Sequence, residues 1–164
     1  MIKEPLGIGL IGCGTVGSGV ARLLLEQPER LAARSGRPLA LRRVVVRDAS
    51  RDRGLALPKE ILTSNLRDVL DDRTIEVAVE LVGGVDWARR AVLELLAAGK
   101  HVVTANKALL AKHGTEVFEA ARKHGRAIAF EASVAGGIPI VAALAQSLSA
   151  NQILSLQGIL NGTC

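Results

Sequence analysis

An apolar run that leads directly into a G-x-G-x-x-G turn is the feature that most constrains how this chain folds. The run covers residues 6–11, and Gly12, Gly14 and Gly17 follow it at that spacing. One glycine permits the tight turn, the next lets the main chain approach a phosphate, and the third lets a helix pack close to a strand. A helical pattern begins at once, and its N-terminus offers N–H groups and a positive dipole end to an anion. The order of strand, turn and helix predicts a site for the pyrophosphate of a dinucleotide, with a plain glycine-rich turn as the alternative.

Apolar runs and helical patterns alternate along the whole chain, which is typical of an α/β fold with a mainly parallel sheet. The sequence predicts one Rossmann-type, doubly wound domain over residues 1–164. The expected strands are 6–11, 39–46, 77–82, 101–104 and 127–130. A first helix is expected directly after the glycine turn and is followed by a loop over 27–38. Further helices are expected at 107–111, after the caps Asn65, Asp86 and Thr115, and from Pro139 onward.

The last residues of the sequence have the pattern of a strand and a turn that lead into a further segment. Residues 153–160 are expected to form a strand, and 161–164 a turn. From this ending we expect a domain cut from a longer protein.

Composition narrows the class of partner. The net charge is +5, and eight arginines fall between Arg30 and Arg53. This basic stretch is either a solvated loop or a patch that meets a phosphorylated cofactor. A nucleic-acid surface is disfavoured, because the chain has no tyrosine and few other rings to stack on bases. No apolar run is long enough for a membrane span, and two isolated cysteines, Cys13 and Cys164, favour a cytoplasmic protein.

The end of the second expected strand is the place where a dinucleotide-binding fold selects its cofactor. An acidic residue there binds a ribose 2′-hydroxyl, whereas an arginine accommodates a 2′-phosphate. Arg47 falls at or beside this place, so the sequence favours NADP(H). Its neighbour Asp48 keeps NAD(H) open.

Two further segments follow expected strands and should reach the same edge of the sheet. Residues 79–84, which include Gly83, and residues 102–107, which include Thr104 and Lys107, are expected to line the nicotinamide side of a cleft. In such a cleft a lysine can orient a carbonyl or move a proton, whereas elsewhere it is ordinary surface chemistry. Glu131 follows another strand and precedes a glycine-rich loop. Its carboxylate either accepts loop N–H groups or joins loop carbonyls around a hard cation.

Taken together, these segments resemble the N-terminal nucleotide-binding region of homoserine dehydrogenase. The resemblance covers almost the whole chain in the family's order, and its most specific parts are Thr-Ala-Asn-Lys and Asn-Gly-Thr. The matching stretches are 9–20, 44–48, 79–84, 102–111, 130–140 and 158–163.

The resemblance implies NAD(P)-dependent interconversion of L-homoserine and L-aspartate 4-semialdehyde, on the route to threonine, methionine and isoleucine. It implies a catalytic role for Lys107, beside the nicotinamide and the reacting oxygen. It maps Thr15, Val16 and Arg47 to cofactor contacts. It also implies a sodium site, formed by Glu131, Val134, Gly136 and Ile138.

The same resemblance implies that the domain enters, at about 150–164, the start of a missing substrate-binding and dimerisation region. Further acidic substrate ligands and a second lysine would belong to that region. Because catalysis needs donor, acceptor and proton donor held together, we expect the chain to bind cofactor with little or no turnover. The parent enzyme is expected to be a homo-oligomer. Two alternatives remain open: a non-catalytic dinucleotide-binding regulatory module, and the nucleotide domain of another amino-acid or aldehyde dehydrogenase.

Overall fold

The computed structural model describes residues 4–51 and 53–158. Within these ranges six strands form one sheet in the order β3-β2-β1-β4-β5-β6, and every neighbouring pair is parallel. This confirms the predicted Rossmann-type α/β architecture. The strands are β1 Leu6–Ile11, β2 Leu39–Val45, β3 Leu62–Thr63, β4 Ile75–Glu80, β5 His101–Thr104 and β6 Ile128–Ala129.

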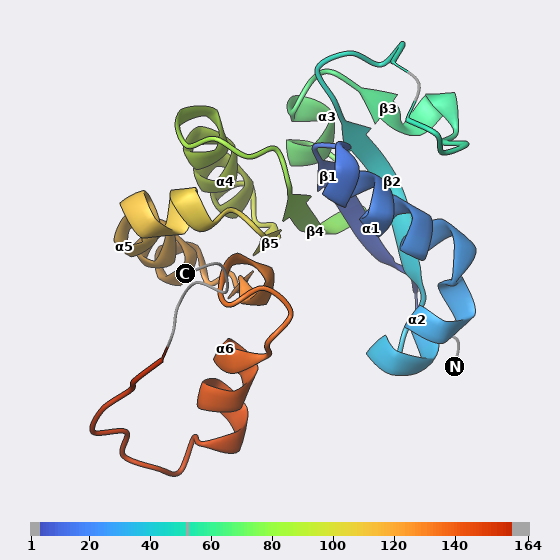
Figure 1. Cartoon of the computed structure of the whole chain (residues 1–164). Coiled ribbons are helices and arrows are strands. Elements are labelled where there is room, and N and C mark those ends of the chain that lie inside the picture. Colours follow the sequence, from blue (N-terminus) through green and yellow to red (C-terminus); the bar gives the residue numbers. More distant parts are fainter. Residues whose placement is uncertain (1–3, 52, 159–164) are drawn as a thin grey trace.

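Helices cover both faces of the sheet (Figure 1). Consecutive residues of a strand point to opposite faces. Accordingly Ile11 packs in a cluster with α3, α4 and α5, whereas its neighbour Leu10 packs in a second cluster with α1. The helices are α1 Thr15–Glu26, α2 Pro28–Ser35, α3 Arg67–Leu70, α4 Asp86–Ala97, α5 Lys107–His124 and α6 Ile140–Ala142, with short turns η1 Lys59–Ile61, η2 Glu131–Ser133 and η3 Ala143–Ser147.

The loop expected over 27–38 was a wrong prediction, because most of it is the helix α2. Local signals for this helix are present in the sequence. Pro28 stands at its first position, Glu29 lies in the first turn, and Gly36 ends it in the left-handed region with φ 74°. The helix is eight residues long, half of its residues are polar and none is buried, so it has few of the apolar residues by which the other helices are recognised.

Other element boundaries also differ from those predicted. Strand β4 lies two residues earlier than the expected 77–82. The expected helix 107–111 and the helix capped by Thr115 are one element, α5, which bends at His113, where φ is −131° and ψ is 17°. Asp86 is the first residue of α4 rather than its cap.

The expected strand over 153–160 is wrong for residues 153–158, which are irregular, while 159 and 160 lie outside the described residues. A strand needs a hydrogen-bonded neighbour, and the described sheet ends at β6. The segment after α6 instead extends away from the sheet (Figure 1), and Leu154 is 87% exposed. The turn expected over 161–164 also lies outside the described residues.

Among the described residues, the helices are either too short or too polar to cross a lipid bilayer.

Candidate functional site

A cleft of about 190 Å³ lies at the carboxyl ends of β1, β4 and β5. The strand order reverses between β1 and β4, because the chain first builds β2 and β3 on one side of β1 and then returns to the other. Ligands of open α/β sheets bind at this kind of switch point. The cleft is lined by Val16, Leu81, Gly83, Ala105, Asn106 and Lys107.

The glycine turn connects β1 to α1 beside this cleft, and its three glycines meet three different constraints. Gly12 has φ +94°, and a Cβ there would lie 2.9 Å from the carbonyl of Leu81. A Cβ on Gly17 would lie 2.2 Å from the carbonyl oxygen of Gly12. A Cβ on Gly14, in contrast, would meet no described atom within 4 Å. Gly12 and Gly17 are therefore required by the fold, whereas Gly14 keeps space open above the turn.

The N-terminus of α1 is prepared for an anion. Gly14 is its N-cap residue, and no described side chain caps the helix. The first turn contains no acidic residue, and Thr15 and Val16 are exposed. The first N–H groups of a helix have no partner within it, so this end can donate to phosphate oxygens.

Lys107 is the first residue of α5, and its exposed side chain lines the cleft. The preceding residue, Asn106, fixes this helix start, because its Oδ1 accepts from the Leu109 N–H at 3.0 Å. Its Nδ2 donates to the carbonyl of Gly84 at 2.8 Å. Asn106 therefore links the loop after β4 to the start of α5 and fixes the backbone that carries Lys107.

A buried polar network lies directly beneath the cleft, and its centre is Glu80. This carboxyl group is fully buried; it accepts from the Thr104 hydroxyl at 2.6 Å and from the Val82 N–H at 3.0 Å. Ser133 donates to the carbonyl of Thr104 at 2.8 Å and so ties the next loop to β5. Thr104 thus supports the cleft from below rather than lining it.

Sequence reasoning placed the segments of Glu80 and Asn106 in the cleft but gave these two residues no role. The signal for Glu80 was present, since this charged residue follows the apolar run 77–79 at the end of β4. Its partners lie 24 and 26 positions away, which local patterns do not reveal.

Arg47 and Asp48 follow β2, and both are exposed. The Oδ1 of Asp48 accepts from both the N–H and the hydroxyl of Ser50, at 2.9 and 2.6 Å. These hydrogen bonds hold the pKa of Asp48 below its ordinary value. Arg53 closes the same loop by donating to the carbonyls of Asp48 and Arg51. The side chain of Arg47 is exposed and has no hydrogen bond or ion pair to a described residue.

Glu131 begins the turn η2 and reaches the start of α6. Its two carboxylate oxygens accept from the N–H groups of Val141 and Ala142, each at 2.9 Å. The exposed residues Val134, Gly136 and Ile138 lie on the loop between them. Glu131 therefore accepts backbone N–H groups, as one of its two expected roles required, but from a helix rather than from the loop itself.

Comparison with known proteins agrees with this geometry. Residues 12–131 match the family described as "Homoserine dehydrogenase, NAD binding domain". The chain is 44% identical over 160 residues to the homoserine dehydrogenase of Bacillus subtilis, covering 98% of this chain and 37% of that protein. It is 45% identical over 162 residues to that of Pseudomonas aeruginosa, covering 98% and 36%.

The crystal structure of a homoserine dehydrogenase from Thiobacillus denitrificans superimposes with a TM-score of 0.83 at 47% identity. The superposition covers 92% of this chain and 35% of that one. The chain thus spans about a third of the length of these relatives. The glycine turn, the cleft at the switch point and a family match over residues 12–131 agree, and the chain belongs to the family of homoserine dehydrogenase NAD-binding domains.

Proposed function

We propose that this chain binds NADP(H), in preference to NAD(H), along the glycine turn and the adjoining cleft. In the whole protein it would then serve the interconversion of L-homoserine and L-aspartate 4-semialdehyde. The observation that carries the proposal is the open space above Gly14, next to an uncapped helix N-terminus and a cleft that contains Lys107.

The described residues fit the parts of such a cofactor. Gly12, Gly14 and Gly17, with the N–H groups of Thr15 and Val16, suit the pyrophosphate. Arg47 suits a 2′-phosphate, because its exposed guanidinium has no partner among the described residues. One oxygen of the Asp48 carboxylate, in contrast, already accepts two hydrogen bonds from Ser50. Gly83 and Lys107 line the cleft, and Thr104 supports it through Glu80.

When bound, the nicotinamide supplies the hydride donor or acceptor of the reaction. Lys107 would hold the reacting oxygen or move its proton, because its ammonium lines the cleft on a rigid helix start. It is the charged member of the lining, which otherwise consists of apolar residues, a glycine and Asn106. Catalysis needs hydride donor, acceptor and proton donor held together, and the resemblance places further substrate ligands outside these residues. We therefore expect little or no turnover by the 164-residue chain.

Calorimetric titration tests cofactor binding, with Gly14→Ala and Gly19→Ala as a matched pair. A Cβ at either position meets no described atom within 4 Å, so both variants should fold. Gly14→Ala should lose NADP(H) binding, because its methyl group would occupy the approach to the turn, whereas Gly19→Ala should bind normally. Absence of NADP(H) binding to the wild-type chain at millimolar concentration contradicts the proposal.

A separate assay tests the expectation of inactivity. The purified chain is mixed with NADP⁺ and L-homoserine, and formation of NADPH is followed. A clear homoserine-dependent rate would refute the claim that essential groups lie outside these residues, without affecting the claim of cofactor binding.

We further propose a sodium site at Glu131, Val134, Gly136 and Ile138. One carboxylate and three main-chain carbonyls form a donor set of hard oxygen ligands. Each oxygen of Glu131 that accepts an N–H keeps another lone pair, and the carbonyls of Val134 and Gly136 accept no hydrogen bond from described residues. The melting temperature should rise in NaCl relative to KCl at equal ionic strength, and Glu131→Gln should abolish that difference. Equal curves in the two salts for the wild-type chain contradict the site.

A further inference from the structure

A second cavity, of about 260 Å³, lies at the opposite edge of the sheet. It is formed where β4 and β5 begin and where α4 ends, so the sheet separates it from the cofactor cleft. The lining includes Arg73, Glu76, Gly99, Lys100, His101 and Arg126. Most of these side chains carry a positive charge or an N–H donor. Neither the glycine turn nor Lys107 lines this cavity.

Lys100 is the most unusual of these residues, because it is a charged residue with only 5% of its surface exposed. Its Nζ donates to the carbonyls of Asp72 and Ile75, at 2.7 and 2.9 Å. No carboxylate among the described residues forms an ion pair with it, so its charge lacks a direct counterion. Burial, opposed by Asp72, lowers the pKa of Lys100, and the positive charge of Arg126 also lowers it. An ammonium has three donors, and two are used here.

The other donors around the cavity are also available. In the described part of the chain, the side chains of Arg73 and Arg126 have neither a hydrogen bond nor an ion pair. The guanidinium of Arg126 lies over Gly99, with Nη2 3.6 Å from the position of a Cβ there. The Nδ1 of His101 accepts from the Ala127 N–H at 3.0 Å, so the proton of its neutral ring is on Nε2.

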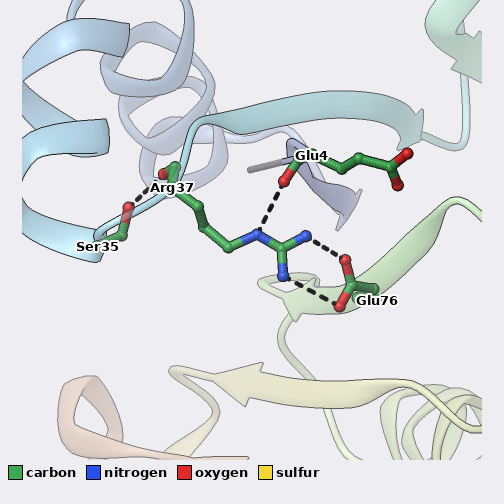
Figure 2. Close-up of polar contacts among 4 residues, drawn as sticks. All are labelled: Glu4, Ser35, Arg37 and Glu76. Carbon is green, nitrogen blue, oxygen red and sulfur yellow. Dashed lines mark hydrogen bonds and ion pairs between the residues drawn. The ribbon is translucent and has the colours of Figure 1, made fainter. Parts of the chain in front are cut away.

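The carboxylate in the lining, Glu76, is neutralised from outside. Figure 2 shows Arg37 between Glu76 and the carbonyl of Glu4. The Nη2 of Arg37 lies 2.6 Å from the Oε1 of Glu76, and its Nε donates to the Glu4 carbonyl at 3.1 Å. Arg37 therefore offsets the charge of Glu76, and the other charged residues of the lining are cations.

We propose that this cavity is a second anion site, which binds a small oxyanion with a phosphoryl or carboxylate group between Lys100, Arg73 and Arg126. Guanidinium groups present paired donors that match such oxyanions. A bound anion would give Lys100 its counterion, and burial makes that interaction stronger than on the surface. A water molecule takes roughly 30 Å³, so 260 Å³ holds a phosphate together with several waters.

A purely structural role for Arg126 predicts a different dependence of stability on added anion. Cations near the last turn of a helix interact favourably with its negative end, and Arg126 lies beside Gly99, just after α4. If that is its entire role, replacing Arg126 lowers stability to the same extent with and without an added anion. The two explanations are therefore separated by how stability depends on the anion.

The test measures thermal unfolding and calorimetric binding with sodium phosphate and, separately, with sodium succinate, NaCl keeping the ionic strength constant. The variants are Arg126→Gln, Arg73→Gln and Lys100→Met. Arg90→Gln is the matched control, since this exposed arginine of α4 does not line the cavity. Arg47→Gln reports phosphate bound at the cofactor site instead.

We expect saturable binding to the wild-type chain and to Arg90→Gln, with a rise in melting temperature of about 5 °C at a hundredfold excess over Kd. Arg126→Gln should weaken binding at least tenfold, and it remains informative if Lys100→Met fails to fold. A response to phosphate alone, or to succinate as well, shows which oxyanion group the cavity accepts. The proposal is overturned by absence of saturable binding, by equal responses of Arg126→Gln and Arg90→Gln, or by a loss confined to Arg47→Gln.

Discussion

The hydroxyl of Thr104 donates a 2.6 Å hydrogen bond to the carboxyl group of Glu80, and both side chains are fully buried. This contact joins the ends of β4 and β5 below the cleft. A buried acceptor that loses its donor costs the free energy of its desolvation. The hydrogen bond between Thr104 and Glu80 therefore affects both the stability of the fold and the geometry of the strand ends.

Thr104→Val should therefore destabilise the chain by about 1–3 kcal/mol, because valine has nearly the same shape but neither donates to Glu80 nor accepts from the Asn106 N–H. Urea unfolding measures the effect. Thr115→Val is the control, since Thr115 is exposed on α5, and it should change the free energy of unfolding by less than about 0.5 kcal/mol. Equal effects at the two positions would show that the buried hydrogen bond contributes little.

Gly17→Ala should prevent the close approach of α1 to the turn. Its Cβ would lie 2.2 Å from the carbonyl oxygen of Gly12, whereas a Cβ on Gly19 has open space. We expect Gly17→Ala to lower the free energy of unfolding by at least about 2 kcal/mol through backbone displacement, and Gly19→Ala to raise it by up to about 1 kcal/mol. Denaturant curves compare the two, and a stable Gly17→Ala chain would contradict the geometry of the turn.

Arg47→Asp tests the proposed cofactor preference. A guanidinium that binds a 2′-phosphate contributes about 1.5–3 kcal/mol, so NADP(H) affinity should fall at least tenfold while NAD(H) affinity changes little. Arg90→Asp makes the same charge change at another exposed position and should affect both cofactors only weakly. Equal losses of both affinities in Arg47→Asp would remove this residue from the 2′-phosphate site.

Arg89 on α4 and Glu116 on α5 form an ion pair whose effect should depend on pH. Hydrogen bonds from Arg89 hold the pKa of Glu116 below its ordinary value of 4.5. A carboxyl group whose pKa is lower in the folded state stabilises that state above its unfolded pKa, and this contribution disappears as the pH falls through the folded value.

Arg89→Gln should therefore be less stable than the wild-type chain at neutral pH. The difference should shrink as the pH falls below the ordinary value of 4.5 and vanish below the lowered pKa of Glu116. Urea unfolding at a series of pH values measures it. Arg90→Gln serves as the control, because Arg90 is the next residue of α4 and its side chain is exposed. A difference that stays constant from neutral to acidic pH would mean that the pair is not its cause.

Much of the fold could be predicted from the sequence because it depends on local signals. Gly99 and Gly125 end α4 and α5 with φ of 80° and 61°, as expected of glycines that follow helical patterns. The side chain of Asn65 accepts from the Arg67 N–H at 3.0 Å at the start of α3, although the N-cap residue is Leu66 rather than the predicted Asn65. Helix α2 was missed because it is short and has few apolar residues.

The strand expected over 153–160 shows the limit of such reasoning. Its apolar residues fit a strand, but a strand exists only where another strand offers its N–H and C=O groups. No such partner lies beside residues 153–158 among the described residues.

The sequence by itself determined the order of strands and helices, the glycine turn and the choice of Arg47 and Lys107 as site candidates, because periodicity, caps and motifs act over a few neighbouring residues. Only the tertiary structure decided how the polar groups are paired. It placed Thr104 on Glu80, 24 positions away, and the Lys100 ammonium on the carbonyl of Asp72, 28 positions away. Such pairs depend on which chain segments the sheet brings together, and the free energy of burying a polar group is settled by the partner that it finds there.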